Sequence, residues 1–129
     1  MTEFMEVIKN AASWLWGFEQ VRFTIDALIK LGVTTILSGF IGFEREHSHR
    51  PAGFRTHILV AVGSSLVMLT SVYVFDSQGM SGDVTRMSAQ VLSGIGFLGA
   101  GTILREGFSV KGLTTAASLW AVACIGIAV

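Results

Sequence analysis

The sequence has few charged residues and almost no cysteine or proline. Charged residues make up 14% of the 129 positions, whereas soluble domains carry about a quarter. The 9 basic and 9 acidic residues cancel to a net charge of +0, so no charge excess favours a nucleic-acid partner. The single cysteine, Cys124, excludes an internal disulfide. With one proline and no proline- or serine-rich linker, residues 1–129 are predicted to form one domain.

Apolar residues are abundant and occur in long runs. The hydrophobic fraction is 51% and the mean hydropathy is +0.64, which indicates a membrane protein. The third run, 87–104, contains no charge and would form a helix roughly 27 Å long, close to the thickness of the hydrocarbon core. We therefore predict an all-α, polytopic membrane helix bundle of about four spans. The spans are expected at 23–43, 57–75, 87–104 and 113–129.

The first 22 residues have a different pattern. Apolar residues recur there with a helical period, and Trp14 suits the depth of lipid headgroups. We expect residues 1–22 to form an amphipathic helix that lies in the membrane interface.

Small residues are concentrated in the third run. Such residues let helices approach closely inside lipid, within one chain or between two, so they are predicted to form a helix-packing surface. The same stretch matches the dinucleotide pattern G-x-G-x-x-G, but no strand precedes it and no acidic residue follows at the required distance, which excludes a nucleotide site. The predicted packing residues are Gly94, Gly96, Gly99 and Gly101.

Basic residues in the links between spans predict the orientation. The links 44–55 and 105–112 together carry Arg45, Arg50, Arg55, Arg105 and Lys111, whereas the link 76–86 carries only Arg86. By the positive-inside rule the first two links are cytoplasmic. The last run ends without a polar residue, which suggests a fragment of a longer protein.

Two interpretations of the link 44–55 remain open. In the first, its arginines bind lipid phosphates and set the topology. In the second, Glu44 belongs to an ion or partner site close to the third span. The carboxylates of 44–55 and of 76–86 lie on opposite sides of the membrane, so no single metal site can use both sets. Within the first span, Asp26 and Lys30 are expected to form an ion pair, and a relay role is the alternative.

Four ordered blocks of the sequence resemble the MgtC/SapB family of bacterial inner-membrane proteins. They cover nearly everything from about residue 23 onward. The blocks are Gly42-Phe-Glu-Arg-Glu46, Arg50-Pro-Ala-Gly-Phe-Arg-Thr-His57, Ala89-Gln-Val-Leu-Ser-Gly-Ile-Gly-Phe-Leu-Gly-Ala-Gly-Thr-Ile103 and Val110-Lys-Gly-Leu-Thr-Thr-Ala-Ala-Ser-Leu-Trp120.

The resemblance implies a fold and a function. Family members have about five spans, and many add a soluble carboxyl-terminal domain, which is absent here. The best-known members support growth in low magnesium and survival inside macrophages, which is a part of virulence, and they are described as regulators that restrain the rotary ATP synthase. Partners implied for this chain are membrane lipids, other inner-membrane proteins and a second copy. The alternative is a transporter or channel for Mg²⁺ or a small solute, with Glu44 at its mouth and Gln90 in its path.

The family pattern also marks individual residues. The candidate interaction or ion-site residues are Glu44, Arg45, Arg50, Arg55, His57 and Gln90. In the last block the pattern marks Gly112, Thr114, Thr115, Ser118 and Trp120. Because no nucleophile motif or metal-ligand spacing is present, we expect neither an enzyme nor a resident metal or cofactor.

Overall fold

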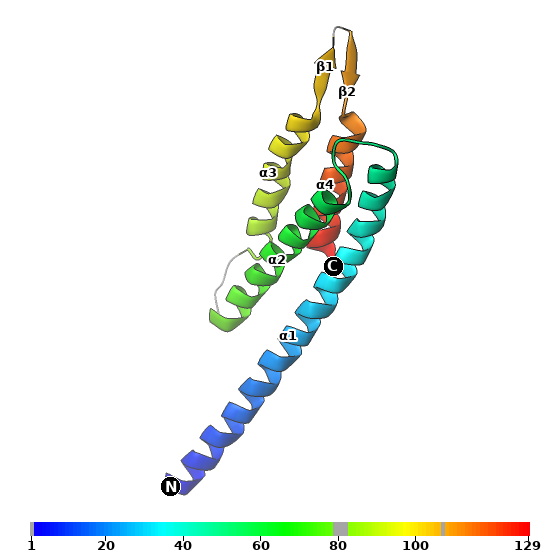
Figure 1. Cartoon of the computed structure of the whole chain (residues 1–129). Helices are drawn as coiled ribbons and strands as arrows, with labels where there is room; N and C mark the ends of the chain where they lie inside the picture. Colours follow the sequence, from blue (N-terminus) through cyan, green and yellow to red (C-terminus); the bar gives the residue numbers. More distant parts are fainter. Residues whose placement is uncertain (1, 79–82, 107) are drawn as a thin grey trace.

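In the computed structural model, which describes residues 2–78, 83–106 and 108–129, four helices and one β-hairpin follow one another along the chain. The all-α prediction is confirmed, with the small hairpin as an addition. Successive helices run in opposite directions, so the α1–α2 loop and the hairpin lie at the same end of the bundle (Figure 1). The elements are α1 (Thr2–His47), α2 (Phe54–Gln78), α3 (Arg86–Thr102), β1 (Leu104–Glu106), β2 (Ser109–Lys111) and α4 (Leu113–Ala128).

Helices α2 and α4 are at the centre of the bundle. Each of them contacts the other three helices. The amino-terminal half of α1 extends beyond the other helices (Figure 1). The packed part of the molecule is therefore the half that carries the α1–α2 loop.

Helix α1 is one continuous helix of 46 residues. The separate amino-terminal helix predicted for residues 1–22 is therefore wrong as a structural unit. No proline and no glycine pair occurs between residues 2 and 47, so the backbone hydrogen bonds continue through the expected boundary. A location of the first 22 residues at the membrane interface stays a prediction.

Within the part of the chain that the structure describes, two helices are long and apolar enough to cross a membrane, by length and composition. The stretch Gly17–His47 has 31 residues and Phe54–Ser77 has 24. Helices α3 and α4 are shorter, with 17 and 16 residues. The positions of the predicted spans agree with the helices, but the number of spans stays a prediction.

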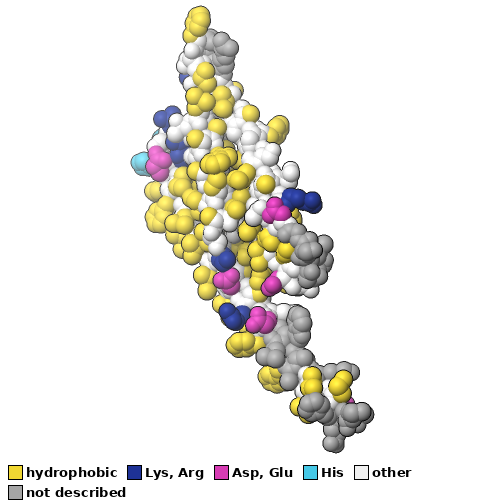
Figure 2. Space-filling model, turned by 180° about the vertical axis from the view of Figure 1, so that it is seen from behind, with side chains coloured by type: hydrophobic (Ala, Val, Ile, Leu, Met, Phe, Trp, Pro, Cys, Tyr) yellow, Lys and Arg dark blue, Asp and Glu magenta, His cyan; other side chains and the backbone are white. Residues whose placement is uncertain are grey.

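The distribution of side chains is typical of a protein in lipid. Large apolar residues face outward: Phe40 and Leu59 are each 72% exposed, and Phe97 is 83% exposed. Hydrophobic side chains cover the middle of the bundle, with charged side chains above and below them (Figure 2). The interior instead holds small and polar residues, such as Ser38, whose hydroxyl donates to the Thr34 carbonyl at 2.7 Å. Soluble monomers rarely expose so large an apolar surface to water, whereas in a membrane the lipid chains cover it.

The link between α3 and α4, for which no strand was predicted, forms an antiparallel hairpin in which Leu104 pairs with Lys111. Gly112 follows it with φ 91°, a left-handed conformation that a side chain would strain. A Cβ atom there would also overlap the carbonyl of Thr102. Gly112 thus lets the chain leave the hairpin directly into α4.

Asp83 organises the entry to α3. Its Oδ1 accepts the hydroxyl of Thr85 at 2.6 Å and the Thr85 backbone N–H at 2.8 Å. These two hydrogen bonds, together with nearby Arg86, hold the pKa of the Asp83 carboxyl below its ordinary value. Their contribution to stability is therefore present above the unfolded pKa and is lost as the pH falls through the folded one.

Three of the four glycines of α3 that were predicted to pack against other helices contact no other helix of the described chain. A Cβ atom on Gly94, Gly96 or Gly101 meets no atom of the described chain within 4 Å, whereas one on Gly99 meets Ala116 Cβ at 3.4 Å. The buried residues of helix α3 are Ser88, Ile95 and Gly99; Gly99 meets α4, and the Ser88 hydroxyl donates to Met68 Sδ of α2 at 3.1 Å. The expected packing within one chain is therefore wrong for three of the four glycines, while contact with a second chain stays a prediction.

The close helix contacts occur at other glycines. A Cβ on Gly42 of α1 lies 2.8 Å from Phe54 Cα of α2, and one on Gly126 of α4 overlaps the carbonyl oxygen of Ala61 in α2. Because backbone atoms cannot move aside as a flexible side chain can, these two sites require glycine.

This contrast between Gly126 and Gly96 is testable. We expect Gly126→Ala to lower the free energy of unfolding in detergent by about 1–3 kcal/mol, because the new methyl group overpacks the α2–α4 contact. The matched control, Gly96→Ala, should leave it unchanged or raise it by up to about 1 kcal/mol through helix propensity. Equal losses in the two variants would contradict the described helix contacts.

Candidate functional site

Four polar side chains join α1, α2 and α4 at the end of the bundle that carries the α1–α2 loop. Arg45 is 8% exposed, His57 0% and Thr115 1%, and Ser118 is half-buried. We call these residues the polar cluster. Burying several charged and polar side chains close together costs free energy unless they form hydrogen bonds with one another.

His57 connects α2 to α4. Its Nδ1 lies 2.8 Å from the Gly53 carbonyl oxygen, and its Nε2 lies 3.0 Å from Ser118 Oγ. A carbonyl oxygen only accepts, so Nδ1 carries a proton. Ser118 Oγ also lies 2.9 Å from the Thr115 carbonyl oxygen, to which it can donate. Ser118 thus connects the imidazole of His57 to the backbone of α4.

Arg45 connects α1 to α4. Its Nη2 donates to Thr115 Oγ1 at 3.1 Å, and its buried Nε has no hydrogen-bond partner. Among the described residues no carboxylate lies within ion-pair distance of Arg45. The guanidinium belongs to the last turn of α1, where the helix dipole stabilises a positive charge, but it also faces the first turn of α4, where the dipole opposes one.

The loop sequence positions this cluster. The Arg50 N–H donates to the Arg45 carbonyl at 3.1 Å, and Ala52 is buried at 4% exposure. Pro51 fixes the backbone of the turn, after which the Gly53 carbonyl accepts the His57 N–H at 3.2 Å and begins α2. Gly42 allows α2 to approach α1 so closely that its Cβ position is 3.0 Å from His57 Cβ.

The structure brings together only part of the predicted site. Arg45 and His57 belong to the polar cluster, while Glu44, Arg50 and Arg55 are exposed at the same end of the bundle. The hydroxyl of Ser48 donates to Glu44 Oε1 at 3.0 Å. Gln90 is exposed in the second turn of α3, a helix that begins at the opposite end of the bundle from the α1–α2 loop (Figure 1), and its role as a site residue stays a prediction.

Two members of the cluster were absent from the predicted site. Thr115 and Ser118 lie three residues apart, so they share one face of α4, and that face points to Arg45 and His57. The family pattern marks both residues. The residue type of a threonine or serine in an apolar helix, however, does not reveal which side chain it bonds to. The missing information was which face of α4 turns toward α1 and α2.

Ionisable groups elsewhere form a simpler arrangement. Lys30 Nζ lies 3.5 Å from Asp26 Oδ2, which confirms the predicted ion pair, and their side chains are 38% and 58% exposed. Within residues 2–78, 83–106 and 108–129, no group of three or more histidine, cysteine, aspartate or glutamate side chains is placed to hold a metal ion.

The bond between His57 and Ser118 can be tested directly. We expect Ser118→Ala to lower the free energy of unfolding by about 1–3 kcal/mol, because it leaves a fully buried imidazole nitrogen without a partner. The control, Ser93→Ala, removes an exposed hydroxyl of α3 and should change stability by less than about 0.5 kcal/mol. Thermal unfolding in the same detergent measures both, and a neutral Ser118→Ala would rule out the described bond.

Comparison with known proteins gives a consistent family. The family model described as MgtC family matches residues 31–129, which include the whole polar cluster. Protein MgtC of Brucella abortus is 53% identical over 94 residues, which are 71% of this chain and 37% of that protein. Protein MgtC of Salmonella typhimurium is 46% identical over 101 residues, or 78% and 41% of the two chains.

A third relative, from Escherichia coli K12, carries the name putative magnesium transporter YhiD. It is 42% identical over 112 residues, which are 82% of this chain and 51% of that protein. The chain thus spans about half or less of the length of these curated relatives, between 37% and 51%. No solved structure matches it. On the family match and these identities, the chain belongs to the MgtC family of membrane proteins.

Proposed function

We propose that this chain is a multi-pass protein of the bacterial inner membrane that acts in adaptation to magnesium limitation and in virulence. It acts as a regulator of other membrane proteins, and the restraint of ATP synthase is the activity that the family resemblance implies. It is not an enzyme, and nucleic acid is not its partner. The loops 44–55 and 105–112 face the cytoplasm, where Arg45, Arg50 and Arg55 follow the positive-inside rule.

The observation that carries a binding role rather than transport is the buried Arg45. A divalent cation moving through the bundle would pass a guanidinium that has no described carboxylate beside it. Even at about 6 Å and an effective dielectric constant of about 20, the repulsion is roughly 5 kcal/mol. The buried polar residues described are hydroxyl groups, one arginine and one histidine, and a bundle lined in this way supplies no anionic ligand for Mg²⁺.

The second candidate is a transporter or channel for Mg²⁺ or a small solute. It is favoured by the name of the Escherichia coli relative, putative magnesium transporter YhiD. In this chain its ligand would be Glu44, which is exposed at the cytoplasmic end of α1. The two candidates differ in whether the purified protein carries out transport alone.

Reconstitution into liposomes separates them. We expect the chain to give no Mg²⁺ influx above protein-free liposomes, read with an enclosed Mg²⁺-sensitive dye, because Arg45 repels the ion. A known magnesium channel in parallel liposomes shows that the assay detects flux. Influx that requires the chain and is lost in Glu44→Gln would reject the regulatory proposal and favour transport.

The surface proposed for contact with partners is the outward face of α3. Gly94 and Gly101 share the helix face of Phe97, which is 83% exposed, and leave the backbone beside it open, while Gly96 is open on the adjoining flank of the helix. Open backbone beside one large side chain suits a close helix–helix contact in lipid. The partner is another inner-membrane protein or a second copy of the chain.

Cross-linking in living cells tests this surface. A photo-reactive residue in place of Gly96 should yield adducts with membrane proteins, because that position is open on α3. The matched control is Leu59 of α2, which is 72% exposed and proposed to face lipid. Adducts of equal yield at both positions, or none at Gly96, would contradict the proposed contact surface.

A further inference from the structure

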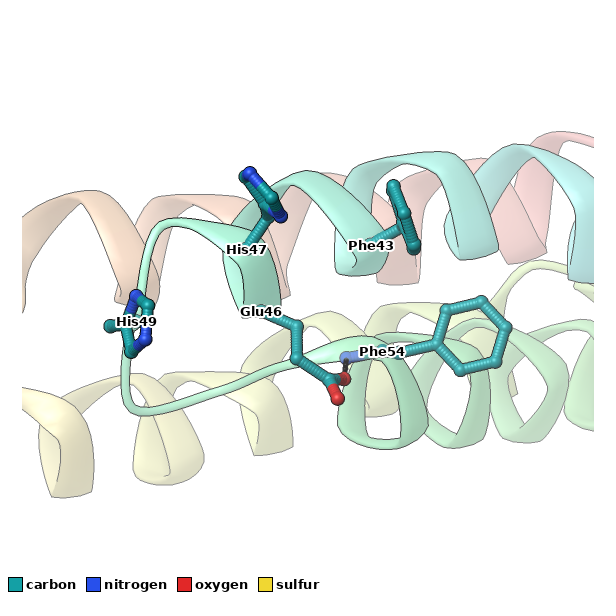
Figure 3. Close-up of a pocket in the computed structure, with 5 residues that line it drawn as sticks. All are labelled: Phe43, Glu46, His47, His49 and Phe54. Atoms are coloured by element: carbon teal, nitrogen blue, oxygen red, sulfur yellow. Dashed lines mark hydrogen bonds between the residues drawn. The ribbon is translucent and has the colours of Figure 1, made fainter.

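An open groove of about 530 Å³ lies where α1 ends and α2 begins. Its lining combines two phenylalanines, two histidines and one glutamate, namely Phe43, Glu46, His47, His49 and Phe54. In Figure 3 the rings of Phe43 and His47 lie side by side on α1, while Glu46 reaches from α1 toward the first residue of α2. The polar cluster contributes no residue to this lining.

The two carboxylate oxygens of Glu46 differ in their hydrogen bonding: one caps α2 and the other is open to the groove. Glu46 Oε2 accepts the Phe54 N–H at 2.9 Å and so caps the start of α2 (Figure 3). No described residue donates to Oε1. The bond to Phe54 holds the carboxylate in one orientation, so a fixed, exposed negative charge faces the groove.

The aromatic residues add affinity for a positive charge. Phe43 is 66% exposed and Phe54 is 41% exposed, and the rings of Phe43 and His47 stack at a centroid distance of 6.4 Å. Aromatic faces attract cations and do not attract anions. A groove that combines one oriented carboxylate with two exposed phenyl rings is therefore suited to an ammonium group.

The location of the groove indicates which class of molecule supplies the ammonium group. The two helices of membrane length end here, at His47 and at Phe54, so the groove lies at the depth of the lipid headgroups. The histidines of the lining supply ring N–H donors within the same groove. A zwitterionic headgroup matches both features, with its ammonium on the carboxylate and its phosphate on the histidines.

We propose that this groove binds the headgroup of a phospholipid that carries a primary ammonium. Glu46 Oε1 accepts an N–H of the ammonium, Phe43 and Phe54 contact its charge, and His47 or His49 donates to the phosphate. A metal ion does not fit, because the described residues hold no group of three ligands. The inference does not depend on the regulatory role proposed above.

Native mass spectrometry of the full chain in detergent tests this site. Phosphatidylethanolamine and phosphatidylglycerol are added in turn, and the lipid-bound fraction is measured. We expect the chain to retain phosphatidylethanolamine in preference, and Glu46→Gln to weaken that binding about fivefold or more. The glutamine still offers an oxygen to the Phe54 N–H, so this variant removes the charge and keeps the cap.

Two further variants make the result specific. Glu44→Gln removes the exposed carboxylate that accepts from Ser48 on the same helix turn, and it should leave lipid binding unchanged. Phe43→Leu keeps apolar bulk but removes the ring, so it should weaken phosphatidylethanolamine binding without affecting phosphatidylglycerol. Equal binding of the two lipids by the unaltered chain would overturn the proposal. So would full binding in both Glu46→Gln and Phe43→Leu, or an equal loss in Glu44→Gln.

Discussion

The buried guanidinium of Arg45 constrains the packed half of the molecule. With one hydrogen bond to Thr115 and an unpartnered Nε, it is stable in that position only if α1 and α4 stay in contact. His57 and Ser118 add a second connection, from α2 to α4. Three helices are thus held together by directional polar bonds in addition to the close packing at Gly42 and Gly126, which suits a bundle in lipid, where helix association rests on packing and interhelical hydrogen bonds.

The same feature links the fold to the proposed function. A positive charge without a described counter-ion opposes the passage of cations, and the outward faces of α3 and of the α1–α2 junction remain available for contacts with proteins and lipids. In the proposed function, the interior of this bundle maintains its stability and its exterior supplies the contact surfaces. Such a division is consistent with a regulator that acts through contact.

The sequence was sufficient to predict the helices but not the relative orientation of their faces. Apolar runs predicted the membrane class and most helix positions, because hydropathy depends on residue type. The continuous α1 was missed because the change from amphipathic to apolar residues near Phe23 has no effect on backbone hydrogen bonding. Gly96 was assigned to packing and Gly126 was overlooked, since glycine content does not reveal which face of a helix meets its neighbour. For the same reason Arg45 and His57 were predicted, but their partners on α4 were not.

A double-mutant cycle on Arg45 and Thr115 tests the central claim most directly. The variants Arg45→Met, Thr115→Val and the double variant are unfolded in the same detergent, and the coupling free energy is calculated from the differences. A direct bond in a buried site predicts a coupling of about 1 kcal/mol or more. A coupling below about 0.3 kcal/mol would mean that the two residues act independently, and the account of a bundle held by its polar cluster would be wrong.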